Sequence, residues 1–172
     1  MVEEQRLSED WIKEYEKNII TRKIHQVSEN LGVARYIFST SSNWKLRKDA
    51  LARLIGSIDA LVSALPLLKG EEKQIMEWQE KVNEFNYILM GDMEIIKRKG
   101  IKVIKVRDGL NVYTFPSTSG ALKILKEVEN LLREINLWTT KKGLRITLPF
   151  YRKVGKESVL EAEGIDKLVD LE

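Results

Sequence analysis

The stretch KVIKVRDGLNVYTF, residues 102–115, alternates apolar and polar residues on both sides of Asp108-Gly109, whereas most of the chain has helical periodicity. Asp-Gly between two such runs is a strong hairpin signal. The pattern predicts a β-hairpin over residues 101–115, with a type I′ turn. An isolated hairpin is only marginally stable in water, so this one must pack on a helix, gain a third strand or dock on a partner. Residues 144–152 predict such a third strand, which Pro149 confines to an edge.

Apolar residues on both sides of the hairpin recur at intervals of three and four, which predicts helices. The helix after it begins with a cap near Thr118 or Ser119 and runs to about residue 138. The helix before it covers about residues 71–96, with a break or kink at Gly91-Asp92. A third helix covers residues 43–68, and the short link at Lys69-Gly70 predicts antiparallel packing of the two. Although residues 51–68 approach membrane-spanning length, Arg53 and Asp59 favour a buried helix and no membrane partner.

The first segment has one apolar stripe, from Ile12 and Tyr15 to Leu31, with Ser8 as a cap and Gly32 as a stop. Residues 33–38, VARYIF, fit either a continued helix or a short strand. The 172 residues are enough for one domain with its own core. We therefore expect a mainly α (α+β) fold over residues 1–172, with an antiparallel four-helix-bundle-like core and a small antiparallel hairpin or three-stranded sheet.

Composition indicates the setting of the protein. Cysteine is absent, which excludes disulfides, thiolate metal sites and cysteine nucleophiles. The amino-terminal residues are acidic and lack an apolar signal segment, so we expect a cytoplasmic protein. Lys, Glu and Ile are abundant while His and Pro are scarce, a bias typical of hyperthermophiles. We expect an archaeal source, with the gene on the chromosome or on a mobile element.

Charge is unevenly distributed along the chain. Residues 94–108 hold six bases against Glu94 and Asp108, a net charge of +4, and residues 141–156 hold six bases and no acid, a net charge of +6. Residues 157–172 form an acidic tail, with six acids against Lys167, a net charge of −5, and GIDKLVDLE at its end fits a short helix. Edge lysines that prevent strand aggregation explain the basic pole most simply, and the alternatives are phosphate contacts or an acidic protein partner. The candidate nucleic-acid contacts are Lys97, Arg98, Lys99, Lys102, Lys105, Arg107, Lys141, Lys142, Arg145, Arg152 and Lys153.

Over residues 93–115, the order of helix end, KRKG, strand, Asp-Gly and NVYTF resembles the recognition helix and wing of winged-helix DNA-binding domains. The resemblance implies that the hairpin contacts DNA. Such domains place two short helices and a tight turn upstream, whereas this sequence has two long helices there. The family is therefore not assigned.

Residues with the chemistry of a catalytic or metal site do not converge in the sequence. His25 is the only histidine, and VGKES at residues 154–158 lacks the upstream glycine of a phosphate loop. Glu71-Glu72-Lys73 could be half of a metal-dependent nuclease site, but acids at a helix start are better explained by the helix dipole. We expect no cofactor and no metal. The leading hypothesis is a non-enzymatic interaction or assembly protein that self-associates or binds a protein partner, and the alternative is nucleic-acid binding.

Overall fold

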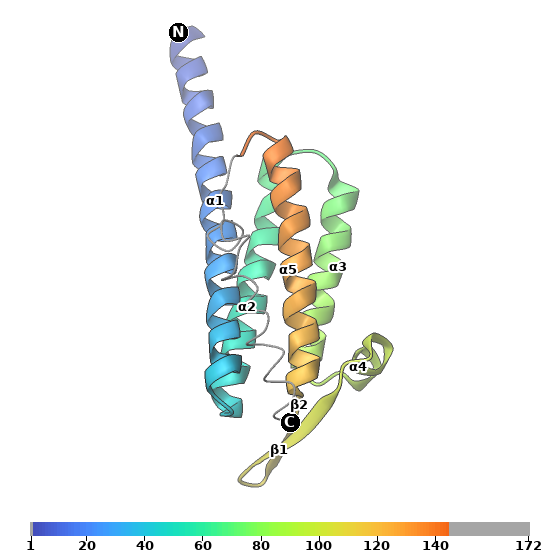
Figure 1. Ribbon diagram of the computed structural model, residues 1–172. Helices are drawn as coiled ribbons and strands as arrows, with labels where there is room; N and C mark the ends of the chain where they lie inside the picture. The colour runs from blue at the N-terminus through green and yellow to red at the C-terminus, as the bar shows by residue number, and fades with distance from the viewer. Residues whose placement is uncertain (1, 145–172) are drawn as a thin grey trace.

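The computed structural model describes residues 2–144, with side chains from residue 11 onward. Four long helices run side by side, and helices that follow one another in this set are antiparallel (Figure 1). They are α1 (Val2–Thr40), α2 (Trp44–Ala64), α3 (Glu72–Leu89) and α5 (Thr118–Lys141). The 3-10 turn η1 (Leu65–Leu68) extends α2. The short helix α4 (Met93–Lys99) and the strands β1 (Val103–Asp108) and β2 (Asn111–Pro116) lie at one end. The prediction of a mainly helical fold with a small antiparallel sheet is confirmed.

The core lies between the long helices, and α2 packs against all three of the others. Its apolar positions, spaced three or four apart, are buried as predicted. Asn43 caps α2, because its side-chain oxygen accepts hydrogen bonds from the backbone N–H groups of Lys45 and Leu46. Each fully buried aliphatic side chain contributes about 1.5–3 kcal/mol of transfer free energy. This burial supplies the main stabilisation of α2.

The continuous stretch Trp44–Leu68 is long and apolar enough to cross a membrane, with a mean hydropathy of 1.7 in its most apolar window. Half of that window is buried inside the structure. The buried side chains include Leu51, Leu54 and Ile58. The buried half of this stretch packs against α1, α3 and α5.

Helix α1 differs from its prediction at both ends. It begins at Val2, so Ser8 is not its cap, and it continues through Gly32 to Thr40. A glycine inside a helix costs about 1 kcal/mol relative to alanine. Residues 33–38 are helical and bury Ala34 and Phe38, which outweighs that cost.

The amino-terminal part of α1 projects past the other helices (Figure 1). All 39 residues of α1 together span about 58 Å, whereas the 21 residues of α2 span about 32 Å. Ile12 and Tyr15, which were predicted to face the core, are therefore exposed, and among the described side chains full burial begins at Ile20.

The predicted break at Gly91-Asp92 separates α3 from α4. Gly91 has a φ of 81°, in the left-handed region. The Asp92 side chain caps α4 by accepting hydrogen bonds from the N–H groups of Glu94 (3.1 Å) and Ile95 (3.4 Å). Helix α4 ends at Gly100, whose φ is 66°. A short, independent helix thus precedes the hairpin.

The hairpin forms as predicted, but its turn is shifted by one residue. Asp108 pairs with Asn111, so Gly109 and Leu110 form the loop. Only Gly109 has a positive φ, 63°, whereas a type I′ turn needs positive φ at both loop residues. Glycine at the first loop position fits a type II′ turn instead. Leu110 lies fully exposed at the tip.

The sheet of the described residues has two strands. The predicted third strand falls on residues 144–152, of which Leu144 is not in a strand and the others lie outside the described residues. The acidic tail at 157–172, with its predicted short helix, also lies outside them.

Candidate nucleic-acid interface at the hairpin end

The base of the hairpin is fixed to the start of α5 by a close backbone approach. The backbone N–H of Ser117 donates to the carbonyl oxygen of Lys102 at 2.8 Å. A Cβ at Gly120 would overlap with that oxygen and would lie 3.0 Å from Cγ2 of Ile101. Ser117, rather than Thr118 or Ser119, caps α5, and its Oγ accepts a hydrogen bond from the N–H of Gly120. The hairpin therefore projects from a rigid attachment.

Arg47 joins three elements behind the hairpin. The first half of α2 is rich in bases, yet Arg47 is buried. Its Nε donates to the carbonyl oxygen of Ser41 and its Nη1 to Oγ1 of Thr118, each at 2.8 Å, and its guanidinium lies 4.9 Å from the Phe38 ring centre. Arg47 is buried because α5 starts beside this turn of α2, which brings together residues 71 positions apart in the sequence.

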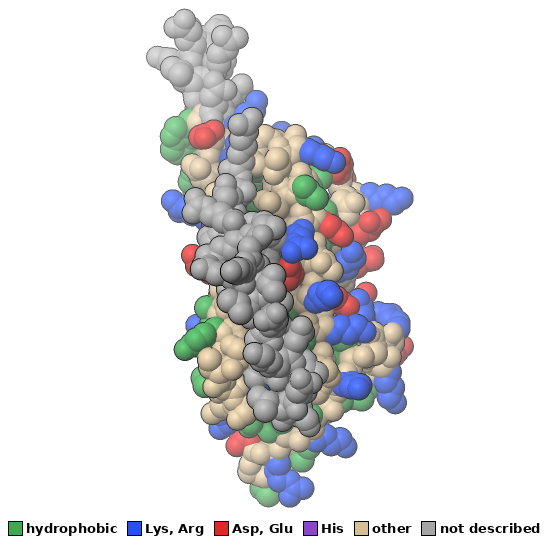
Figure 2. Space-filling view, viewed as in Figure 1, with side chains coloured by type: hydrophobic (Ala, Val, Ile, Leu, Met, Phe, Trp, Pro, Cys, Tyr) green, Lys and Arg blue, Asp and Glu red, His purple; other side chains and the backbone are tan. Residues whose placement is uncertain are grey.

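We define the hairpin end as α4, the two strands and the starts of α2 and α5. Figure 2 shows Lys and Arg side chains gathered at the lower right and at the lower tip, where Figure 1 places α4 and the hairpin. The exposed bases of α4 and the hairpin are Lys97, Arg98, Lys102, Lys105 and Arg107. Lys105 and Arg107 lie on one face of the ribbon, with their partners Thr114 and Val112.

Four of these bases, Lys97, Lys102, Lys105 and Arg107, have no ion pair within residues 11–144. Arg98 lies 3.6 Å from the Glu84 carboxylate, and its side chain remains mostly exposed. The positive charge at this end is therefore largely uncompensated by the part of the chain that the structure describes.

Lys99, another predicted contact, is directed toward the protein. Its Nζ lies 3.0 Å from Glu84 and 3.8 Å from Glu127, and its side chain is only 25% exposed. These ion pairs link α4 to α3 and α5. We therefore leave Lys99 out of the interface.

The structure does not bring Lys141 and Lys142 to the hairpin. They end α5, whose 24 residues span about 36 Å from its start beside the hairpin. We call that opposite end the loop end: residues 65–71, residues 138–144 and the adjoining turn of α1. Arg145, Arg152 and Lys153 lie outside the described residues.

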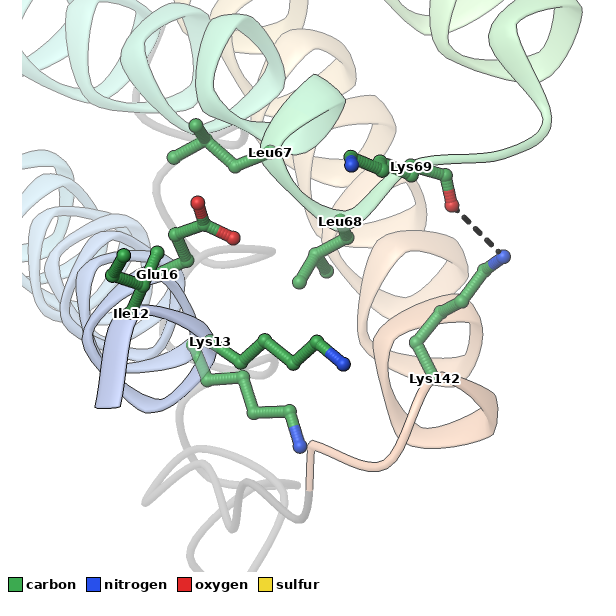
Figure 3. A pocket seen from close by; sticks show the side chains of 8 residues that line it. Ile12, Lys13, Glu16, Leu67, Leu68, Lys69 and Lys142 are labelled. Atoms are coloured by element: carbon green, nitrogen blue, oxygen red, sulfur yellow. Dashed lines mark hydrogen bonds between the residues drawn. The ribbon is translucent and has the colours of Figure 1, made fainter. Parts of the chain in front are cut away.

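The loop end contains a groove of about 440 Å³ between α1, η1 and α5 (Figure 3). Its lining includes Ile12, Leu67 and Leu68 and several lysines. Nζ of Lys142 donates to the carbonyl oxygen of Lys69 at 3.2 Å and lies 5.4 Å from the Trp138 ring centre. The Lys142 ammonium thus has partners within the protein.

Sequence reasoning missed a cluster of aromatic and basic side chains at the hairpin end. The rings of Trp44, at the start of α2, and Tyr113, on β2, have centres 5.9 Å apart and an interplanar angle of 32°. Nζ of Lys48 lies 4.9 Å from the Tyr113 ring centre and 5.8 Å from that of Trp44. Lys45 lies 5.9 Å from the Trp44 ring centre and pairs with Asp108 at 3.7 Å. Trp44 and Lys48, four apart on a helix, were the available signal, but only the fold places Tyr113 beside them.

Trp44, Lys48 and Tyr113 line a cleft of about 390 Å³ between α2, the α3–α4 turn and β2. Its other walls include Met90, Gly91 and Phe115, and also Val112 and Thr114, the register partners of Arg107 and Lys105. Tyr113 is on the ribbon face opposite Lys105 and Arg107, because its register partner is Val106. The Tyr113 ring and the bases Lys105 and Arg107 therefore lie on opposite faces of the ribbon, although Val112 and Thr114 also line the cleft.

The residues considered for a catalytic or metal site lie in places that a structural role explains. The Glu71 carboxylate accepts a hydrogen bond from Nε1 of Trp138, and Glu72 begins α3, where an acid favours the helix dipole. His25 lies half-buried within α1. Across the described residues, no three His, Cys, Asp or Glu side chains are grouped closely enough to hold a metal ion. The VGKES segment lies outside the described residues.

The chain matches no protein-family model, no curated protein and no solved structure. The functional argument therefore rests on the geometry of the chain itself.

Proposed function

We propose that this chain is a non-enzymatic nucleic-acid-binding protein that contacts phosphates through its hairpin end. The observation that carries the proposal is a group of exposed bases on one projecting unit, Lys97, Lys102, Lys105 and Arg107, which have no ion pair among the described residues. Lysine and arginine that neutralise phosphates release counterions, which supplies affinity without reading sequence. In this proposal the long helices are an antiparallel four-helix bundle, within one domain, that holds the unit in place.

A nucleic acid fits this end better than an acidic protein does. A two-stranded ribbon is narrow enough to enter the major groove of B-DNA. The Gly91-Asp92 break places a short helix immediately before the hairpin, so helix, ribbon tip and bases project from the same end. Lysine and arginine side chains that contact phosphate oxygens fix the orientation of a protein on the duplex. The expected contacts are therefore electrostatic and largely independent of base sequence.

The test is titration of the protein into labelled duplex DNA at about 50 mM and about 200 mM salt, where binding through several phosphates weakens steeply. The variant Lys105→Glu/Arg107→Glu should bind more than about tenfold more weakly and show a shallower salt slope. The matched control is Lys73→Glu/Lys141→Glu, which makes the same charge change on exposed residues at the loop end. Equal losses in the two variants, or no salt-dependent binding by the parent protein, would overturn the proposal.

Self-association is a second candidate, favoured by the projecting part of α1. Trp11 is 68% exposed, and its ring stacks on the exposed Tyr15 at 5.7 Å between centres. Exposed aromatics of this kind are typical of interaction surfaces. Lys13, Glu14, Glu16 and Lys17 carry balanced charges along the same segment, so net charge does not oppose contact with a second copy.

Light-scattering mass measured over a range of protein concentrations tests this second candidate. The parent protein should form a dimer that Trp11→Ser/Tyr15→Ser converts to a monomer. A monomer at every concentration would exclude self-association through this segment.

A further inference from the structure

We propose that the aromatic cleft at the hairpin end binds one unpaired base of a single-stranded nucleic acid, by stacking on Trp44 or Tyr113. The inference rests on the proposed nucleic-acid function and extends it from duplex phosphates to single strands. The Tyr113 ring lies on the ribbon face opposite Lys105 and Arg107, so the stacking rings and the two bases can be changed by separate mutations.

The shape of the cleft fits a single small group. Its volume of about 390 Å³ is within the range of small-ligand pockets, about 300–1,000 Å³. The Trp44 and Tyr113 ring centres are 5.9 Å apart, too close for a base to enter between them. A base would therefore stack on the open face of one ring, with Met90 at the edge of the cleft. The bases of a duplex are paired and stacked on one another, so they are not available to stack on these rings.

The exposure of the cleft distinguishes it from core packing. Tyr113 is 37% exposed and Met90 is 76% exposed, whereas Phe115, the next residue on the same face of β2, is buried. Tyr113 and Met90 thus leave apolar surface in contact with water, and a flat apolar ligand would cover it. Base stacking on aromatic side chains is the usual way in which proteins hold single strands.

The charges around the rings suit a nucleotide rather than a neutral aromatic ligand. The ammonium groups of Lys45 and Lys48 lie within 6 Å of the Trp44 ring centre. Both side chains are long and flexible, so each can turn from the ring to the phosphate that flanks a stacked base. The cleft thus combines a stacking surface with phosphate ligands.

The test compares an oligo-thymidine of about 12 nucleotides, within the site sizes of single-strand-binding folds, with a blunt duplex. Trp44→Leu, which keeps apolar volume but removes the ring, should weaken single-strand binding about tenfold and leave duplex binding unchanged. Trp44→Phe should restore most of the loss. Lys105→Glu/Arg107→Glu should show the opposite pattern, with the larger loss on the duplex. Thermal melting of each variant checks that the fold is retained.

The outcomes separate this inference from the proposed function. Duplex binding by the parent protein with no single-strand binding, or single-strand binding that Trp44→Leu leaves intact, overturns the stacking site and leaves the proposed function standing. Equal loss on both ligands in Trp44→Leu shows that the ring only positions the hairpin, which also overturns the stacking site. Absence of binding to either ligand overturns both proposals.

Discussion

The two ends of the helical assembly differ in the surroundings of particular lysines and arginines. At the loop end, Lys142 contacts the Lys69 carbonyl and the Trp138 ring. At the hairpin end, Lys102, Lys105 and Arg107 are exposed without a carboxylate partner among the described residues, while Arg47 is buried beneath them. The comparison shows that positive charge alone does not mark an interface. The partners that the fold gives each base decide between a structural role and an external one.

Backbone geometry differs between the ends as well. The hairpin end is held by a close, hydrogen-bonded approach of the segment before β1 to the start of α5. At the loop end, Lys69 and Glu71 have φ values of 50° and 51°, in a region that favours glycine. One end is closely packed and the other retains backbone strain.

The largest expected effect comes from breaking the close approach at the hairpin end. Gly120→Ala places a methyl group against the Lys102 carbonyl oxygen and should lower the free energy of unfolding by about 3 kcal/mol, because backbone must move to relieve the overlap. Gly56→Ala is the matched control, since nothing lies within 4 Å of a Cβ there, and it should stabilise the protein by about 0.5–1 kcal/mol. Chemical denaturation measures both, and similar effects in the two variants would contradict the described contact.

The next largest effect tests the buried base of the hairpin end. Arg47→Met removes two hydrogen bonds and leaves the Ser41 carbonyl without this donor, so we expect a loss of about 2 kcal/mol. Arg53→Met, at a side chain that is 72% exposed and paired with Asp49, should change stability by no more than about 0.5 kcal/mol. Thermal and denaturant unfolding distinguish the two variants. If Arg47→Met leaves the free energy of unfolding unchanged, the contact between α2 and the start of α5 does not depend on this side chain.

The smallest expected effect is at the loop end, where the free energy of unfolding should rise rather than fall. Lys69→Gly relieves the positive φ while keeping the carbonyl that accepts from Lys142, and should stabilise the protein by about 1 kcal/mol. Lys126→Gly, at an exposed position inside α5, should instead destabilise it by about 1 kcal/mol. Loss of stability in Lys69→Gly would mean that this residue is not strained.

Local patterns predicted much of the fold. The apolar spacing of α2, α3 and α5, the break at Gly91-Asp92 and the hairpin around Gly109 were all readable, because they depend on neighbouring residues. Gly32 was misleading, because burial of Phe38 farther along α1 outweighs the local penalty. The turn was misplaced by one residue, since pairing of Asp108 with Asn111 sets its register.

The candidate site was predicted only in part, because it depends on contacts between distant segments. Lys105 and Arg107 are exposed on the hairpin, as their pattern indicated. The Arg47–Thr118 hydrogen bond, the Lys99 ion pairs and the Trp44–Tyr113 cluster all join residues far apart in the sequence. None of these contacts tests the hyperthermophilic archaeal source that the composition suggested, so that origin stays a prediction.

Leu110 stands fully exposed at the tip of a two-residue loop, in a chain that contains no cysteine. Leu110→Cys would therefore introduce a unique thiol at the outermost point of the ribbon, away from the Trp44–Tyr113 cluster. A fluorescent or spin label attached there would report the orientation and motion of the ribbon directly. Such a label would report on the hairpin alone, because the chain has no other thiol.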